Sequence, residues 1–251
     1  MFMSNTSWQK VSLWYNRLIE EKGNFYHQEL IIPKSLALLN LSAEGSLLDL
    51  GCGQGVLAKA LPGNVYYQGI DIAPSLIDFA KKQDRKPLHH YSIGDVTKPL
   101  LIDKKDFTHA AVILALQNIE DPKSVLQNAA GHLVQNCKLL IVLNHPAFRI
   151  PRQSSWGVDR ANKIQYRRIN RYLTPLKIPI KMHPGMKDSL LTWSFHFPLS
   201  SYSQFLHESG FVIEKIEEWT SPKKSIGKMG KAENLSRSEI PLFLALVARK
   251  V

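Results

Sequence analysis

A glycine-rich turn after a short apolar run is the first feature of the sequence that could bind a ligand. In LLDLGCGQG (47–55), Gly51 and Gly53 follow an apolar segment, and Asp71 ends the next apolar run. Glycine adopts backbone conformations closed to other residues and carries no side chain, so a ligand can touch the backbone there. A carboxylate at the end of the following strand can accept hydrogen bonds from both hydroxyls of a ribose. The pattern predicts a site for an adenosine-containing cofactor.

The same turn lacks the residues that pyrophosphate-binding loops use. A Walker loop needs a Gly-Lys pair followed by Ser or Thr, and the turn has none. A dinucleotide fingerprint places its third glycine one position beyond Gly55, where this chain has Val56. Cys52, inside the turn, is more typical of a small buried residue than of a nucleophile. Both kinds of pyrophosphate site are therefore disfavoured.

Four segments in order resemble the motifs of class I S-adenosylmethionine-dependent methyltransferases. They are LLDLGCGQG (47–55), GID (69–71), GD (94–95) and ALQNIEDP (115–122). The motifs span roughly residues 35–145, and the predicted order of strands extends the resemblance to the C-terminus. It implies S-adenosyl-L-methionine as cofactor and methyl transfer as activity.

The resemblance also implies roles for residues at the ends of the first four strands. The predicted cofactor-binding residues are Asp49, Gly51, Gly53, Asp71, Ile72, Asp95, Val96, Leu114 and Gln117. Asp71 would hold the ribose hydroxyls, Ile72 would pack on the adenine, and Asp95 would accept from the adenine amino group. Leu114 and Gln117 would border the sulfonium. The alternatives are a turn cap for Asp95 and a core position for Leu114.

A histidine after the fifth predicted strand is the candidate general base. Methyl transfer from a sulfonium is an in-line displacement, so the protein must align the reactants, exclude water and deprotonate an alcohol or carbon acid. His145 follows the strand predicted at 138–143 and could reach the cleft. The alternative is that it only begins the turn before Pro146.

Positive charge is concentrated in two segments that could recognise an acceptor. The formal net charge is +11, and residues 149–187 hold ten Lys or Arg against one acid, while 221–237 hold five against one. We predict Arg149 and Arg152, with Tyr26 and His27 from the N-terminal segment, as substrate-binding residues. Three interpretations stay open: a small anionic or aromatic acceptor held by arginine forks, RNA stacked on aromatic residues, or a solvated surface.

Two short patterns in the basic region carry structural predictions of their own. YRRINRY (166–172) would place a basic stripe beside an aromatic one if it were helical. TWSFHF (192–197) alternates, which predicts a strand with its aromatic face in the core and its polar face towards the acceptor. The loop at 221–232 is predicted as a linker.

Strands and helices alternate from residue 47 and predict an α/β fold. We expect a Rossmann-like, seven-stranded, mostly parallel sheet with helices on both faces and an antiparallel last strand. The two closing strands, 211–219 and 241–250, are predicted to pair at the sheet edge with no helix between them. The expected organisation is one domain over 1–251, with an N-terminal helical cover (1–40) and a substrate cap (145–198) after the fifth strand.

Composition narrows the class of protein further. A chain of 251 residues with 44% hydrophobic residues can bury a sizeable core, and its two cysteines fit neither a disulfide framework nor structural zinc. No apolar run is long enough to span a membrane, so we expect a cytoplasmic protein. The expected function is methyl transfer to an O or C atom of a small molecule. RNA methylation, a nicotinamide-dependent oxidoreductase and a non-catalytic cofactor-binding protein are the alternatives, and neither the acceptor nor the oligomeric state follows from the sequence.

Overall fold

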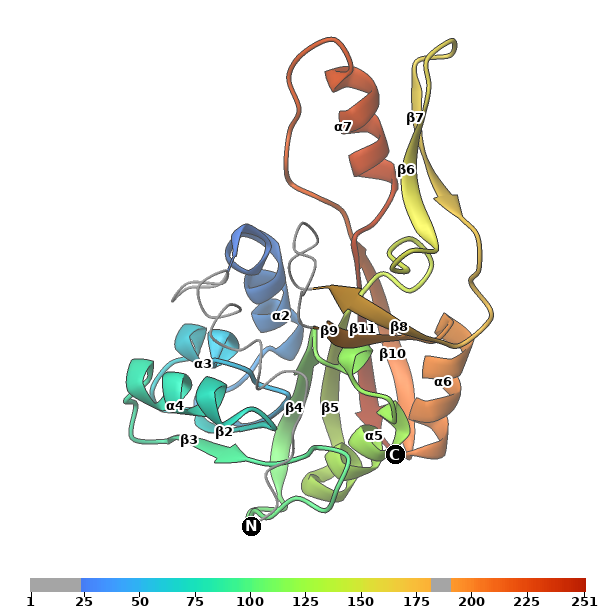
Figure 1. Cartoon of the computed structure of the whole chain (residues 1–251). Coiled ribbons are helices and arrows are strands. Elements are labelled where there is room, and N and C mark those ends of the chain that lie inside the picture. The colour runs from blue at the N-terminus through green and yellow to red at the C-terminus, as the bar shows by residue number, and fades with distance from the viewer. Residues whose placement is uncertain (1–23, 182–190) are drawn as a thin grey trace.

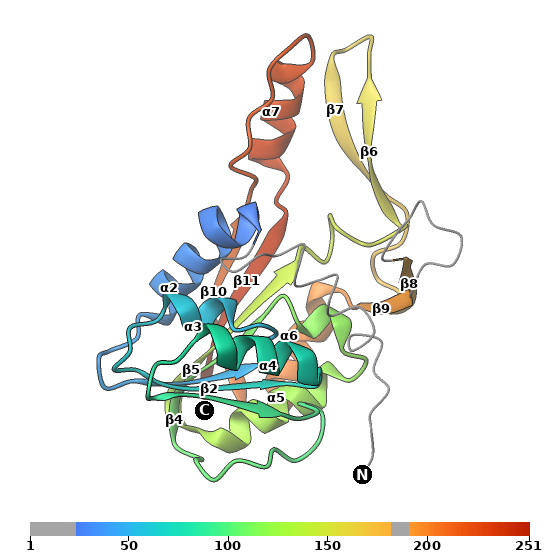
Figure 2. The same cartoon turned by 60° about the vertical axis from the view of Figure 1, so that its left-hand side comes forward.

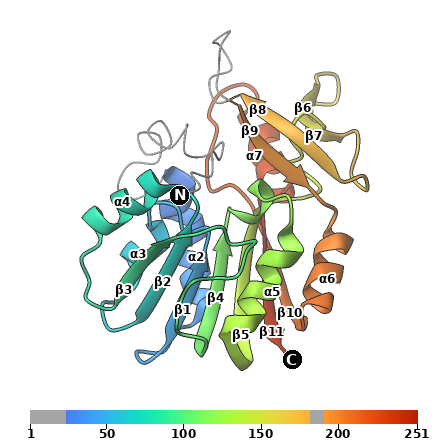
Figure 3. The same ribbon diagram turned by 60° about the horizontal axis from the view of Figure 1, so that its bottom comes forward.

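A seven-stranded mixed sheet organises the computed structural model of the chain, which describes residues 24–181 and 191–251 (Figure 1). The sheet order is β10-β11-β5-β4-β1-β2-β3 (Figure 3). The sheet strands are β1 Ser46–Leu50, β2 Tyr66–Asp71, β3 His89–Ile93, β4 Phe107–Ile113, β5 Leu133–Asn144, β10 Phe211–Trp219 and β11 Phe243–Lys250. Strands β1 to β5 pair in parallel, whereas β11 runs antiparallel to both of its neighbours, β5 and β10. The predicted fold class is confirmed.

Helices cover both faces of this sheet. The α-helices are α2 Ile32–Leu39, α3 Val56–Ala60, α4 Pro74–Gln83, α5 Pro122–His132, α6 Leu199–Glu208 and α7 Gly230–Glu239. A π-helix, His27–Ile31 (η1), leads into α2, and a 3-10 turn, Leu116–Asn118 (η2), follows β4. Along β1, Leu47 packs into the layer of α2, α3 and α4, while Leu48 and Leu50 pack into the layer of α5 and α6. Apolar residues on both faces of the central strands thus hold the two helix layers to one sheet.

Two hairpins lie between β5 and α6, where the sequence predicts an inserted cap. The first pairs β6 (Ser154–Asp159) with β7 (Ile164–Ile169), and the second pairs β8 (Leu176–Lys181) with β9 (Leu191–His196). Figures 1 and 2 show the β6–β7 hairpin and α7 standing side by side, away from the sheet. The Ser236 hydroxyl on α7 donates to Gln165 Oε1 on β7 (2.6 Å) and joins the two. We call this pair of elements the arm.

Three sequence predictions about this region are wrong. YRRINRY does not form a helix: its first four residues belong to β7, because alternating Ile, Tyr and Arg side chains suit a pleated ribbon opposite β6. The two closing strands do form the predicted antiparallel pair at the end of the sheet, but α7 joins them, and β10 is the edge strand with β11 inside it. The loop predicted at 221–232 therefore ends in a helix.

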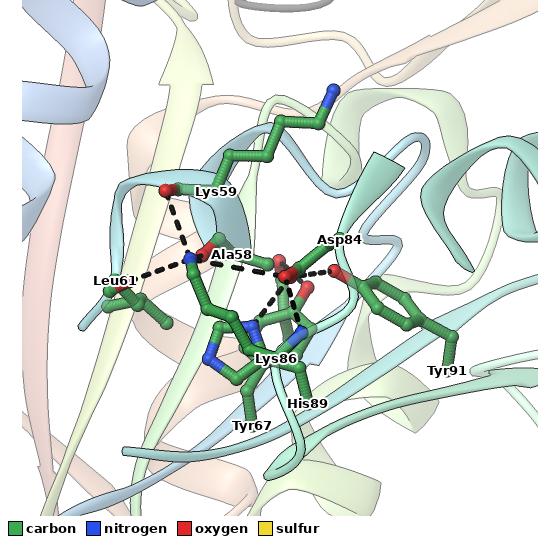
Figure 4. Close-up of polar contacts among 9 residues, drawn as sticks. Ala58, Lys59, Leu61, Tyr67, Asp84, Lys86, His89 and Tyr91 are labelled. Carbon is green, nitrogen blue, oxygen red and sulfur yellow. Dashed lines mark hydrogen bonds and ion pairs between the residues drawn. The ribbon is translucent and has the colours of Figure 1, made fainter. Parts of the chain in front are cut away.

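A buried polar cluster closes the C-terminal end of α3, the helix that follows the glycine turn (Figure 4). Lys86 Nζ donates to the main-chain carbonyls of Ala58 (2.9 Å), Lys59 (3.1 Å) and Leu61 (2.8 Å). Beside it, Asp84 accepts a hydrogen bond from the Tyr91 hydroxyl (2.7 Å) and contacts His89 Nδ1 (2.6 Å). A cation at the negative end of the helix dipole stabilises this short helix and so fixes the turn in front of it.

The predicted N-terminal cover is partly described. From Asn24 the chain is helical through η1 and α2, which pack on the sheet, whereas residues 1–23 of the predicted cover lie outside the described residues. Within 24–181 and 191–251, no helix combines the length and apolar character needed to cross a bilayer.

Candidate functional site

A cavity of about 460 Å³ opens where β1, β2 and β4 end. Eight predicted cofactor-binding residues contribute to its wall: Asp49, Gly51, Gly53, Asp71, Ile72, Asp95, Val96 and Leu114. The sheet explains this convergence, because β1 lies between β2 and β4 and all three run parallel. Chain order reverses between β1 and β4, and ligands of open α/β sheets bind at such a point, beyond the carboxyl ends of the strands. The size is that of a small-molecule site.

The glycine turn gives this cavity a wall made of main chain. Gly51 has φ 79°, and a Cβ there would lie 2.5 Å from the Cβ of Ala115, so no larger residue fits. Gly53 has φ 55°, and a Cβ there would meet no atom within 4 Å. The face of Gly53 is therefore open, and a bound molecule can approach its backbone closely.

Asp71 is tied to the same turn. Its Oδ2 accepts from the Gly53 N–H (2.9 Å) and its Oδ1 from the Ala73 N–H (2.9 Å). Burial raises the pKa of this carboxyl, and the backbone hydrogen bonds from Ala73 and Gly53 oppose that rise. Each carboxylate oxygen can accept more than one hydrogen bond, so both can still receive ribose hydroxyls.

Asp49 is the most deeply buried carboxyl in the cavity wall. Its residue is 2% exposed, and the Tyr67 hydroxyl donates to its Oδ2 (2.8 Å). Burial raises the pKa of Asp49 to about 7, against the lowering effect of the Tyr67 hydrogen bond. A cationic ligand beside it would favour the ionised form, so Asp49 fits the ammonium group of an amino-acid moiety.

The segment after β4 separates two residues that the sequence predicts together. Leu114 lines the cavity with φ 54°, and its carbonyl accepts from Gln117 Nε2 (2.8 Å) and Asn118 Nδ2 (3.3 Å). Gln117 itself is not in the cavity wall, whereas Asn118 is. Gln117 therefore holds the turn that presents Leu114, and we do not propose it as a contact to the sulfonium.

Asp95 caps a turn and also lies in the cavity wall. Its Oδ1 accepts from the backbone N–H (2.9 Å) and the hydroxyl (2.7 Å) of Thr97, which caps the turn after β3. The residue lines the cavity together with Val96, so its second oxygen can serve an adenine amino group.

The candidate base and the two arginines lie outside the cavity wall. His145 is 5% exposed, its Nε2 lies 2.8 Å from Glu218 Oε1, and its Nδ1 accepts from the Ala147 N–H (3.2 Å). With both ring nitrogens occupied, His145 forms the turn after β5, and we do not propose it as the general base. Arg149 packs over the ring of Phe243, and Arg152 is exposed.

The N-terminal segment contributes His27 but not Tyr26 to the wall. His27 is 7% exposed, and its Nδ1 has no hydrogen-bond partner among the described residues. Burial lowers the pKa of His27 to about 4, so the imidazole is neutral at physiological pH. Tyr26 points elsewhere, and its hydroxyl lies 3.2 Å from Ser221 Oγ.

The β8–β9 hairpin supplies an aromatic wall that the sequence assigns to the core. Trp193 and Phe195, predicted as core residues of TWSFHF, line the cavity, and Phe195 is buried as well. The opposite face, with Thr192, is buried against the body, and Ser194 Oγ contacts the Gln117 carbonyl oxygen (3.4 Å). Phe197 packs against the core as predicted, whereas the polar face with Thr192 does not line the cavity. Period-2 alternation shows which residues share a face but not which face meets the ligand.

A salt bridge fastens that hairpin to the cavity rim. Lys177 Nζ lies 3.0 and 2.8 Å from the two carboxylate oxygens of Glu120, which follows η2. Lys177 also packs over Trp193 and Phe195, at 5.3 and 5.5 Å from the ring centroids. Neither Lys177 nor Glu120 stands out in the sequence, because their pairing depends on the hairpin's tertiary position.

Comparison with known proteins agrees with this geometry. Residues 48–139 match the family described as a methyltransferase domain. A crystal structure of an S-adenosylmethionine-dependent methyltransferase from Mesorhizobium loti superposes with TM-score 0.67 at 25% identity, covering 87% of this chain and 96% of that one. The glycopeptide N-methyltransferase MtfA, solved with S-adenosylmethionine, superposes with TM-score 0.58 at 16% identity, covering 87% and 92%.

A curated relative from Coxiella burnetii is named ubiquinone biosynthesis O-methyltransferase. It is 29% identical over 132 residues, which are 50% of this chain and 54% of the relative. The chain thus spans about half the length of the curated relatives it matches.

The fold is therefore that of class I S-adenosylmethionine-dependent methyltransferases, and residues 48–139 match a methyltransferase domain. The family predicted from the four sequence motifs is confirmed. The cofactor of this class is S-adenosylmethionine, and the open face at Gly53 and the carboxylates of Asp49 and Asp71 fit its amino-acid and ribose parts. Among the residues that the structure describes, no cluster of three or more His, Cys, Asp or Glu could hold a metal ion.

Proposed function

We propose that this protein transfers a methyl group from S-adenosylmethionine to an oxygen or carbon atom of a small molecule. The observation that carries the proposal is the composition of the cavity at the strand ends. One side is the glycine turn with Asp49, Asp71 and Asp95, and the other is the aromatic wall of Trp193 and Phe195. The first side suits the cofactor, and the second suits an apolar or aromatic acceptor.

His27 is the residue of the wall best suited to take a proton from the acceptor. When bound, S-adenosylmethionine supplies an electrophilic methyl group on a sulfonium. The imidazole of His27 is neutral and lies in the cavity wall, and its Nδ1, which is buried and has no partner among the described residues, would face an acceptor after a turn of the ring. A neutral imidazole within reach of a hydroxyl can act as a general base as the oxygen attacks. Trp193 and Phe195 would orient the acceptor and exclude water.

An oxygen acceptor has the additional support of the curated relatives. Their printed name is ubiquinone biosynthesis O-methyltransferase, and they match half of this chain. A ring hydroxyl on an aromatic molecule is compatible with a wall of Trp and Phe. We therefore rank O-methylation of a phenolic acceptor first. A cytoplasmic location stays part of this proposal.

The arm favours one second candidate, methylation of RNA. It exposes Trp156 and Tyr166 and carries Arg160, Lys163 and Arg168 on the hairpin. Exposed aromatic and cationic residues suit stacking and phosphate contacts. A nicotinamide-dependent oxidoreductase has no such support, because the glycine spacing lacks the dinucleotide pattern.

Transfer of a labelled methyl group tests the proposal. The full chain is incubated with S-adenosylmethionine carrying a labelled methyl group, with catechol as a model phenolic acceptor or with total RNA. Label in methylated catechol that is lost in Asp71→Ala supports the proposal. Label found only in RNA would replace the first candidate with the second.

A further inference from the structure

Two cations, Arg149 and Lys223, pack on neighbouring aromatic rings, and a third, Arg167, lies close enough to Arg149 to act on its charge while it packs over Trp156. Arg149 lies in the turn after β5, Arg167 on β7 and Lys223 in the loop after β10. The Arg149 guanidinium packs over Phe243 (5.2 Å), and Tyr26 packs against the same ring (5.7 Å between centroids). Lys223 Nζ lies 5.0 Å from the centroid of Tyr26. We call Arg149, Arg167, Lys223, Tyr26 and Phe243 the cation cluster.

No carboxylate of the described residues pairs with these cations. Arg167 donates through Nε to the Phe148 carbonyl (2.6 Å) and through Nη2 to Ser154 Oγ (2.9 Å). Arg149 has neither a hydrogen bond nor an ion pair from its guanidinium to any described residue. The acids on β10 are engaged elsewhere, since Glu218 contacts His145 and Glu217 contacts Lys215.

This arrangement is unfavourable without an anion. Arg149 is half-buried, and burial lowers its pKa, as does the charge of Arg167. A buried charge without a counter-charge costs several kcal/mol in general, so proteins normally pair such groups. An arginine fork without a partner matches the two oxygens of a carboxylate or phosphate.

None of the five residues of the cation cluster lies in the cavity wall, but the cluster adjoins the wall along the N-terminal helix. Tyr26 belongs to the cluster, and the next residue, His27, lines the cavity. Phe243 on β11 pairs with Asn144, the last residue of β5. Strand β5 in turn pairs with β4, which ends just before Leu114 in the cavity wall. A molecule with its reacting hydroxyl at His27 could therefore extend towards Arg149.

We propose that Arg149, Arg167 and Lys223 bind a carboxylate or phosphate of the methyl acceptor, with Tyr26 and Phe243 packing beside it. This proposal rests on the proposed function, and it adds that the acceptor is an anion. A small anionic group is favoured over RNA because Arg149 is half-buried against aromatic rings, whereas the exposed arginines lie along the hairpin of the arm.

A pair of model acceptors that differ only in a carboxylate tests the proposal. Calorimetric titration of the full chain saturated with S-adenosylhomocysteine compares 3,4-dihydroxybenzoate with catechol. We expect the carboxylate to bind about tenfold more tightly, as a charge-assisted bidentate contact requires. Arg149→Gln should remove that preference, and Arg149→Lys should restore only part of it. Arg160→Gln, the same charge change on the exposed hairpin, should keep it. Equal affinity for the two molecules, or a preference that survives Arg149→Gln, would overturn the proposal.

Two further measurements distinguish failure of the anion-site proposal from unfolding of a variant and from failure of the proposed methyl transfer. Lys223→Gln should reduce the preference as well, and thermal unfolding shows whether each variant is folded. Inorganic phosphate, titrated into the cofactor-free protein, should bind the natural chain and not Arg149→Gln, even if methyl transfer itself is disproved. Retained methylation of catechol with no effect of Arg149→Gln on phosphate binding would leave the proposed function intact and reject the anion site. Loss of affinity for an oligouridylate, but not for phosphate, in Arg149→Gln would assign the cluster to RNA instead.

Discussion

The affinity of the cavity for its cofactor should depend on pH through Asp49. Burial raises the pKa of Asp49 to about 7 in the ligand-free protein, so the carboxyl is largely protonated below that pH. If the ionised form holds the ammonium of the cofactor, affinity for S-adenosylhomocysteine should rise by up to about tenfold between about pH 6 and about pH 8. Calorimetry across this range measures the slope. A steep slope that persists in Asp49→Asn would show that another group is responsible.

The stability of the ligand-free protein should depend on Asp49 in the opposite direction. A carboxyl whose pKa is raised on folding binds more protons in the folded state, so its contribution is present below about pH 4 and is lost as the pH rises through about 7. Asp49→Asn should therefore lose less stability than the natural chain between about pH 5 and about pH 8. Urea unfolding at the two pH values measures the loss of stability in each protein. An identical loss in both would contradict the conclusion that burial raises the pKa of Asp49.

His27 should affect turnover and not cofactor binding. We expect His27→Ala to lower kcat for a phenolic acceptor by about 100-fold, in the range of general-base contributions, with an unchanged Kd for S-adenosylhomocysteine. Because burial lowers its pKa to about 4, His27 stays neutral down to about pH 5 and should add no loss of rate between about pH 8 and about pH 5.5. His145→Ala is the matched control, since that ring faces Glu218 outside the cavity. A larger effect of His145→Ala on kcat would reinstate the original assignment.

The residues at the strand ends that line the cavity were predictable because their determinants are local. The glycine turn, Asp71 and Asp95 each sit at a strand end, and a parallel sheet brings strand ends together whatever the loops do. His145 and Arg149 also follow a strand end, but the tight turn after β5 directs them towards β10 and β11. That direction depends on the antiparallel insertion of β11, which no spacing in the sequence encodes.

The β8–β9 hairpin is the element that completes the acceptor side of the cavity. Trp193→Ala should raise KM for a phenolic acceptor about tenfold or more through loss of aromatic contact, with little change in cofactor affinity. Steady-state kinetics together with calorimetry separates the two effects. Trp156→Ala, on the arm hairpin, is the control, and equal effects of the two substitutions would argue against a wall specific to β9.

The Lys86 contact with α3 should matter for stability alone. Lys86→Ala removes a cation from three carbonyls at the end of a five-residue helix and should cost about 1–2 kcal/mol in the free energy of unfolding. Lys82→Ala, an exposed change of the same kind on α4, should cost less than about 0.5 kcal/mol. Urea denaturation compares them, and equal values would mean that the cap contributes nothing measurable.

Periodicity in the sequence predicted the strands and helices of the main sheet, but it did not predict the elements of the inserted region. Strand β10 has the predicted bounds, 211–219, because a turn residue and apolar alternation delimit it. YRRINRY carries both a helical and a strand pattern, and pairing with β6 decides between them. Helix α7 has a weak pattern of its own and is fixed by contacts with β7.

At the scale of the molecule, the sheet carries the cofactor cavity, and the segments added to the sheet carry the residues proposed to recognise the acceptor. The strand ends hold the cofactor cavity, η1 and β8–β9 close it, and the cation cluster joins the arm to the cavity rim. The basic charge noticed in the sequence thus includes the half-buried Arg149 of the cation cluster, exposed arginines on the arm, and Lys177, which pairs with Glu120. This division allows acceptor preference to change without loss of the cofactor site.

Binding of S-adenosylhomocysteine tests the central claim most directly. Calorimetric titration of the full chain should show one equivalent bound, with affinity reduced about tenfold or more in Asp71→Ala, and no heat from NADH under the same conditions. Binding of NADH in the absence of any binding of S-adenosylhomocysteine would contradict the assignment of the cavity to a methyl donor.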